Sequence, residues 1–192
     1  MSAPTPVRGN PVVLIEELRR FPLKRRRVPG PGIVQVYSGR AGRLSCPPGG
    51  LSTGELLWLG PRLVYDIDVS RHDVRHRFEA QSADGSLVAD VEVHAAWRTV
   101  APIVVVASNV SDGPSLVEAA LEALLQHTAA APWRTAAELT GHLAEAPTVV
   151  ELPQGIGVEE IRWVVLSVLA TEAAAPGGDP ETESVSLAGA DA

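Results

Sequence analysis

The residues of this chain that could do chemistry are five histidines, a single cysteine and a group of carboxylates. His72 and His76 lie four residues apart, a spacing that places two metal ligands on one face only in a helix. The residues around them alternate as in a strand, which favours solvated or packed histidines over a metal site. Cys46 is followed by two prolines, and no pattern indicates a base that could activate its thiol.

Five carboxylates lie close together in the sequence and could supply an acid–base pair. Their places on predicted strands and in a predicted turn are explained more simply by a solvated sheet face and a turn residue. The chain also contains neither a Gly-rich phosphate loop nor a nucleophile elbow. We therefore expect no enzymatic activity, with no catalytic residue, no cofactor and no metal. The carboxylates in question are Asp66, Asp68, Asp84, Asp90 and Glu92.

Composition limits the classes to which the protein can belong. The net charge of −7 argues against binding of nucleic acid by bulk electrostatics, and one cysteine excludes a disulfide framework. No apolar run reaches the roughly 20 residues that span a bilayer, and the first ten residues lack a secretory pattern. We expect a cytoplasmic protein. Arginine is frequent whereas Lys24 is the only lysine, which indicates a high-GC bacterial source.

Charge is distributed unevenly, and this asymmetry indicates a contact segment. Residues 1–27 hold seven of the sixteen basic residues, whereas residues 171–192 hold five acids and no base. An apolar run followed by dense positive charge could dock on an anionic membrane, where each cation contributes about 1 kcal/mol. The alternative is a flexible basic arm that pairs with the acidic tail of the same or a neighbouring chain. The candidate contact residues are Val12, Val13, Leu14, Ile15, Arg19, Arg20, Lys24, Arg25, Arg26 and Arg27.

Nucleic acid is not expected as the partner of this segment. Binding of single strands relies on aromatic side chains on which bases stack, and Phe21 is the only aromatic residue near the cations. Protein partners, including further copies of the chain, and an anionic membrane surface remain as the expected partners.

The clearest structural prediction is a β-hairpin in the middle of the chain. Apolar and polar residues alternate over 74–80 and again over 86–98, and the Asp84-Gly85 turn between them suits a hairpin. We expect the face with Leu87, Val91, Val93 and Trp97 to be buried against a helix. That helix is predicted over 115–127 from a capping box that begins at Ser115.

Other elements are predicted from shorter patterns. A second capping box at Thr135 predicts a helix to about residue 144. Residues 103–107 are apolar and leave helix and strand open. The sequence further predicts a short helix over 11–21 and strands over 33–37, 55–59, 63–69 and 161–169.

The order of these motifs resembles the SPFH or band 7 domain of stomatin, prohibitin and flotillin. The resemblance begins at Gly32-Ile33-Val34, continues through Tyr65–Val69, and is carried above all by the turn at 82–85 and the strand ending at 96–102. Val110-Ser111-Asp112, the helix after it, and Gly155–Val158 complete the set. The resemblance implies an α+β fold, with two or three helices packed on a mostly antiparallel sheet.

The resemblance also implies a function and a domain division. We expect an SPFH-like domain over residues 30–170, preceded by a flexible or partly helical basic arm (1–29) and followed by a disordered acidic tail (171–192). Such a domain acts as a self-associating scaffold or interaction module, here peripheral at the inner face of the plasma membrane. The family's usual membrane anchor and coiled coil are not recognised in the sequence. The alternatives are a monomeric regulatory or ligand-binding module and, third, an enzyme with an unrecognised site.

Overall fold

The computed structural model describes residues 9–18 and 28–171, and within them the chain is an α+β protein with two antiparallel four-stranded sheets. The first sheet has the strand order β1-β4-β2-β3 and the second has the order β5-β6-β8-β7. The sequence predicted the α+β class correctly, but it did not predict that the strands divide into two sheets. The elements are β1 (Val12–Glu17), β2 (Ile33–Ser38), a 3-10 turn η1 (Arg40–Gly42), β3 (Leu44–Ser45), α1 (Thr53–Leu59), β4 (Leu63–Asp68), β5 (His72–Gln81), β6 (Leu87–Thr99), α2 (Pro102–Ala107), α3 (Gly113–Ala129), α4 (Ala136–Ala144), β7 (Val150–Glu151) and β8 (Ile156–Ala170).

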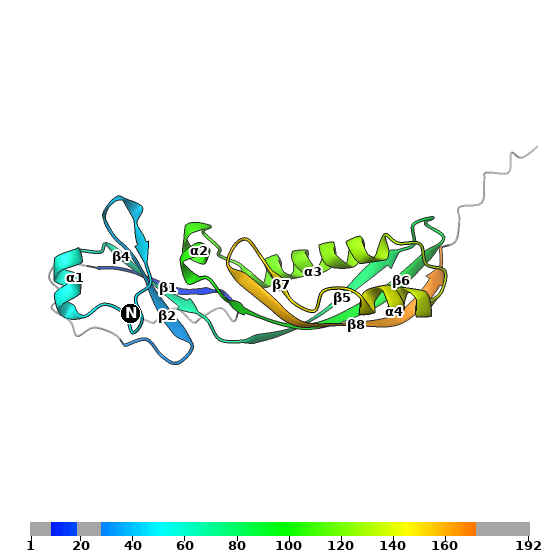
Figure 1. The fold of residues 1–192 in the computed structure, drawn as a ribbon, viewed down its shortest axis with the longest axis horizontal. Coiled ribbons are helices and arrows are strands. Elements are labelled where there is room, and N and C mark those ends of the chain that lie inside the picture. Colours follow the sequence, from blue (N-terminus) through cyan, green and yellow to red (C-terminus); the bar gives the residue numbers. More distant parts are fainter. Residues whose placement is uncertain (1–8, 19–27, 172–192) are drawn as a thin grey trace, which may run out of the picture.

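The molecule is elongated, with the two sheets following one another along its length (Figure 1). The first sheet and α1 form one end, α2 lies near the junction, and the second sheet extends to the other end. Val12 at the start of β1 packs against the core of the second sheet. The two sheets are therefore joined by apolar contact as well as by the chain itself.

The first sheet corrects two predictions. Residues 11–21 were expected to form a helix, but 12–17 form β1, which pairs with β4 so that Ile15 lies opposite Tyr65. The domain consequently begins before residue 30. Glu55–Leu59 were expected to form a strand and instead belong to α1, because Ser52 caps that helix and Glu55 completes a capping box. Local capping outweighs the short apolar pattern there.

The second sheet confirms the predicted hairpin. Strands β5 and β6 pair antiparallel, with Phe78 opposite Val91 and His76 opposite Val93. In the turn, the Asp84 carboxylate accepts hydrogen bonds from the backbone N–H and hydroxyl of Ser86 and from the hydroxyl of Ser82. These bonds stabilise the ionised form and lower the pKa of Asp84 to about 2.

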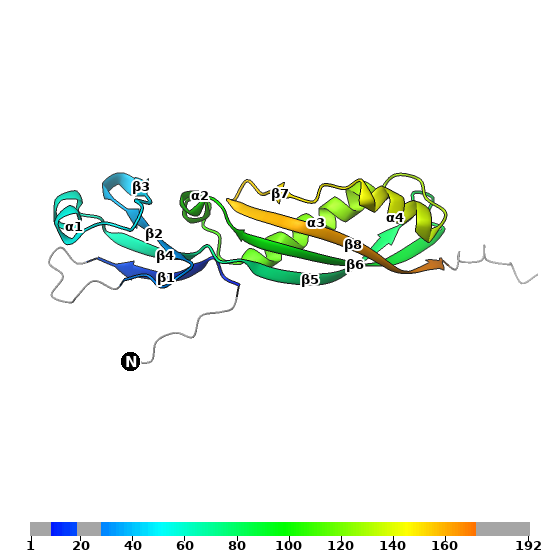
Figure 2. The ribbon, with the colours of Figure 1, turned by 60° about the horizontal axis from the view of Figure 1, so that its bottom comes forward.

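Helices α3 and α4 cover one face of the second sheet and leave the other face bare (Figure 2). Val93 and Trp97 of β6 are buried together with Val117 and Leu121 of α3, which confirms the predicted inward face. Leu139 of α4 is buried in a second cluster beneath the far half of the sheet. In β5 and the far half of β8 the inner face packs and the outer face meets solvent, whereas β6 between them is also buried on its outer face at Glu92 and Ala96.

The start of α3 differs from the prediction by one short turn. The N-cap is Asp112, whose carboxylate accepts from the backbone N–H of Ser115, so Ser115 lies inside the helix. Pro114 occupies the first turn, where a missing N–H is tolerated. The predicted N-cap of α4, Thr135, is confirmed, and the open segment 103–107 is helical as part of α2.

Candidate functional site

The predicted contact segment is in part an element of the fold. Val12, Val13 and Leu14 are half-buried in β1, and only Ile15, at 57% exposure, points largely into solvent. The apolar run is therefore a sheet strand, and three of its four residues contribute to packing. The cations Arg19, Arg20 and Lys24–Arg27 lie outside the described residues.

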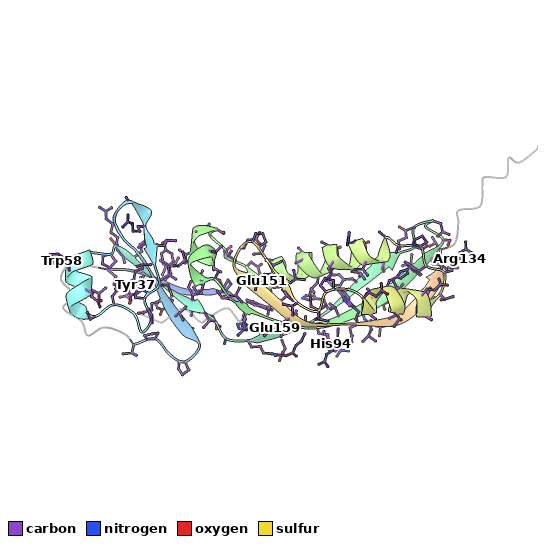
Figure 3. All side chains as sticks on the ribbon, in the orientation of Figure 1. Tyr37, Trp58, His94, Arg134, Glu151 and Glu159 are labelled. Carbon is purple, nitrogen blue, oxygen red and sulfur yellow. The ribbon has the colours of Figure 1, made fainter. Side chains whose placement is uncertain are left out.

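Leu18, the last described residue before the basic stretch, packs against the same cluster as Leu56 of helix α1. The backbone N–H of Leu18 donates to the carbonyl of Arg62 at 2.8 Å, and Arg62 follows α1 by three residues. Leu56 holds α1 against the cluster of Tyr37, Leu51 and Val64. Trp58 points away at the end of the molecule and is 89% exposed (Figure 3). A large indole held in water on a capped helix is a candidate anchor for a partner or a membrane interface.

A shallow groove of about 210 Å³ lies between β1 and α2. Its wall is mostly aliphatic, and its polar groups are amides and hydroxyls. The groove could accept an apolar side chain from a partner. It is lined by Asn10, Val12, Val13, Leu14, Ile15, Tyr65, Val105, Val106, Asn109, Val110 and Ser111.

The bare face of the second sheet carries a charge ladder across β5 and β6. The Arg75 guanidinium lies 2.8 Å from the Glu92 carboxylate, and the His94 ring lies 2.7 Å from the same group. These hydrogen bonds, with that from Arg75 the stronger influence, lower the pKa of Glu92. Next along the strands, Arg77 lies 3.8 Å from Asp90. Each of these charged side chains has a neighbour of opposite sign, so this area carries little net charge. Figure 3 labels His94 of β6 and Glu159 of β8.

One ion pair spans the sheet at its junction end. The Arg71 guanidinium, just before β5, donates to both carboxylate oxygens of Glu160 in β8, at 2.5 and 2.8 Å. This pairing lowers the pKa of Glu160. Glu160 has a left-handed φ of 56° and lies where the β6–β8 register shifts. The bidentate pair fastens the β4–β5 connection to this bulge.

The far half of β8 presents a second apolar surface. Val164, Leu166 and Leu169 are 45%, 41% and 67% exposed on a strand that none of the described helices covers from the outer side. Val88 of β6 lies opposite Leu169 in the ladder and is also partly exposed. The outer face of the sheet thus changes from paired charges on β5 to aliphatic side chains on β8.

The histidines and the cysteine have separate surroundings. His72 lies 3.2 Å from Asp68 and stacks on Trp97, whereas His76 lies 3.7 Å from Glu118 of α3. Within residues 9–18 and 28–171, no three metal-ligating side chains come together. Cys46 is half-buried, and burial raises the pKa of its thiol.

Sequence reasoning missed both exposed apolar surfaces. Trp58 was placed on a predicted strand, and residues 161–169 were predicted to form a strand with no statement of which side is exposed. The capping pair Ser52 and Glu55 was the signal that could have placed Trp58 on a helix.

Within the described ranges no helix has both the length and the apolar character needed to cross a bilayer. No model of a known protein family matches the chain, and no curated protein is significantly similar to it in sequence.

Proposed function

We propose that this chain is a non-enzymatic scaffold or interaction module of SPFH type that self-associates and attaches peripherally to the inner face of the plasma membrane. The observation that carries the proposal is the placement of large exposed apolar side chains near both ends of an elongated molecule. Trp58 lies at one end (Figure 3), and the last residues of β8, which include the exposed Leu166 and Leu169, extend toward the other (Figure 1). Exposed apolar side chains that lie together, as Val164, Leu166 and Leu169 do on β8, are candidates for an interaction surface.

The order of elements supports the SPFH assignment. A hairpin with an Asp-Gly turn is followed by a capped helix, a second helix and a last strand that begins at Ile156. This is the order that the resemblance implies. The assignment rests on these residues and on their order.

The end with Trp58 is the proposed membrane contact. The basic stretch begins directly after Leu18, which is hydrogen-bonded to Arg62 near α1. Tryptophan is favoured at the level of lipid headgroups, and four successive cations from Lys24 to Arg27 would attract anionic lipid. Attachment would be reversible and weakened by salt, because one indole and screened charges give limited affinity.

Vesicle co-sedimentation with the full-length protein tests this contact. We expect binding to anionic vesicles at low salt and loss of binding at high salt. Exchange of Lys24–Arg27 for glutamine should weaken binding by roughly several hundredfold, at about 1 kcal/mol for each cation, and Trp58→Ala should weaken it further. Removal of residues 1–29 is unsuitable as a test because it deletes β1.

Matched controls separate a specific contact from general effects. Arg75→Gln with Arg77→Gln removes cations from β5, and Ile103→Ala removes an exposed aliphatic side chain from α2. Both controls should bind vesicles like the unmodified protein. Equal sedimentation of all variants, or no sedimentation of any, would reject the membrane part of the proposal. A protein that stays monomeric at every concentration would reject self-association and favour the monomeric regulatory module.

A further inference from the structure

Strand β8 has an open edge along its far half. It pairs with β6 over its length, but with β7 only at Gly157 and Val158. The loop before β7 adds one bond, from the Ile161 N–H to the Thr148 carbonyl. From Arg162 to Ala170, β6 is the only strand partner within the described part of the chain. In an antiparallel ladder every second residue turns its N–H and C=O away from its partner, so this edge presents unpaired donors and acceptors.

This edge lacks charged residues and prolines, two of the features that protect other edges. Residues 163–170 read WVVLSVLA, with no charged residue, no proline and no glycine. Trp163, Val165 and Val168 point inward and pack against the cluster that contains α4. Val164, Leu166 and Leu169 lie on the opposite, uncovered side. Charges and prolines are the usual means by which sheet edges avoid pairing, and this stretch has neither.

We infer that the open edge of β8 pairs antiparallel with the same strand of a second copy, about a two-fold axis, so that one sheet continues across both copies. The inference rests on the self-association proposed above and names its surface. An axis perpendicular to the sheet keeps the outer faces of the copies on one side. Val164, Leu166 and Leu169 of both copies would then form one apolar surface across the seam.

Charge at the ends of the strand favours a second copy as the occupant. Arg162 is exposed at the start of the open stretch. From residue 171 onward the sequence holds five acidic residues and no basic one. In an antiparallel pair, Arg162 of each copy lies near the point where the acidic sequence of the other begins. Parallel pairing would instead align like charges, which is destabilising.

The strand itself limits the strength of this pairing. The β6–β8 register shifts near Leu166, so one residue bulges there and increases the local twist. A seam of one short, twisted strand buries less surface than a standard interface. We therefore expect a weak, concentration-dependent dimer in the absence of other contacts.

Lysine substitution on the outer face tests the surface. Two single variants are made, Leu166→Lys and Leu169→Lys. Each places two charges in the seam, one from each copy. Both leucine side chains are already exposed in the single copy, so the lysines should not disturb its folding. Sedimentation of the full chain over a concentration series should show a dissociation constant raised at least about tenfold. Ile103→Lys on α2, where the side chain is 40% exposed, is the matched control and should leave the constant unchanged. Far-UV circular dichroism and a thermal melt verify folding of each variant.

Cysteine cross-linking tests the geometry. In a Cys46→Ser background, Ser167→Cys on β8 should form a disulfide-linked dimer under mild oxidation. Arg77→Cys on β5 is the matched control on the other edge and should remain monomeric. Self-association that the β8 lysines leave unchanged, or cross-linking through Arg77→Cys, would overturn the inference while the scaffold function stands. A protein that never associates would overturn both.

Discussion

Strands β5 and β8 flank the same strand, β6, yet their exposed sides have opposite character. On β5 the outward residues are charged, and Arg75 and Arg77 pair with carboxylates of β6. On the far half of β8 the outward residues are aliphatic apart from Ser167, which lies opposite Asp90. Both strands turn apolar side chains inward, as Phe78 and Val165 show. The inner faces already supply the apolar packing of both strands. The aliphatic residues on the outer side of β8 therefore add nothing to this core, and they form the surface that we propose contacts a partner.

The comparison requires that the inner face carries the stability and the outer face does not. Val93→Asp is the largest test, because Val93 is fully buried on β6 beneath α3. An unpaired carboxylate there should lower the free energy of unfolding by several kcal/mol, roughly 3 or more. Urea denaturation measures the loss. Val88→Asp makes the same change on the outer face of the same strand and should cost far less; equal losses would show that the faces are not distinct.

The second sheet was predictable because its signals are long and agree with one another. Apolar and polar residues alternate over many positions on each side of an Asp-Gly turn, and this pattern allows only one pairing register of the two strands. The capping Thr135 marks the start of the helix that follows. Both features were confirmed. The start of α3 was misplaced because Asp112 and Ser115 both suit an N-cap and lie three residues apart.

The first sheet was less predictable because its segments are short and its pairing is non-local. β1 pairs with β4 across about fifty residues, and its sequence fits a helix as well as a strand. The open edge of β8 had no signal at all. Sequence shows which residues form a strand, but which strands end at a sheet edge is decided by topology. An uncharged, mostly aliphatic run such as 163–169 looks the same in a central strand and in an edge strand.

Helix α4 lies only on the β8 side of the sheet, and its cap gives a test of intermediate size. The Thr135 hydroxyl accepts from the backbone N–H of Glu138 at 3.2 Å. Thr135→Ala should therefore lower the free energy of unfolding by about 1 kcal/mol. Hydrogen exchange should show faster opening of α4 than of β5. Thr140→Ala, inside the same helix and exposed, is the control and should have little effect, because alanine is a good helix former. Equal effects of the two variants would contradict the capping role.

The charge ladder of β5 gives the smallest expected effects. Arg77 and Asp90 are separated by 3.8 Å and both lie partly in water. Arg77→Ala should change the free energy of unfolding by no more than about 0.5 kcal/mol, as for most exposed pairs. Arg75 lies closer to its partner, at 2.8 Å, and Glu92 is nearly buried. Arg75→Ala should thus cost more than Arg77→Ala, with both measured by urea denaturation at neutral pH.

The dependence of that difference on pH identifies its cause. Arg75 is the main reason that the pKa of Glu92 in the folded chain lies below its ordinary value of 4.5. A depressed folded pKa contributes stability that is fully present above the ordinary value, and this stability is lost as pH falls through the folded pKa. The cost of Arg75→Ala should therefore shrink as the pH falls below about 5, where Glu92 becomes protonated. Arg75→Lys, which keeps the charge, should restore part of the loss at neutral pH. A cost that does not change with pH would show that Arg75 contributes through packing of its aliphatic stem and not through its charge.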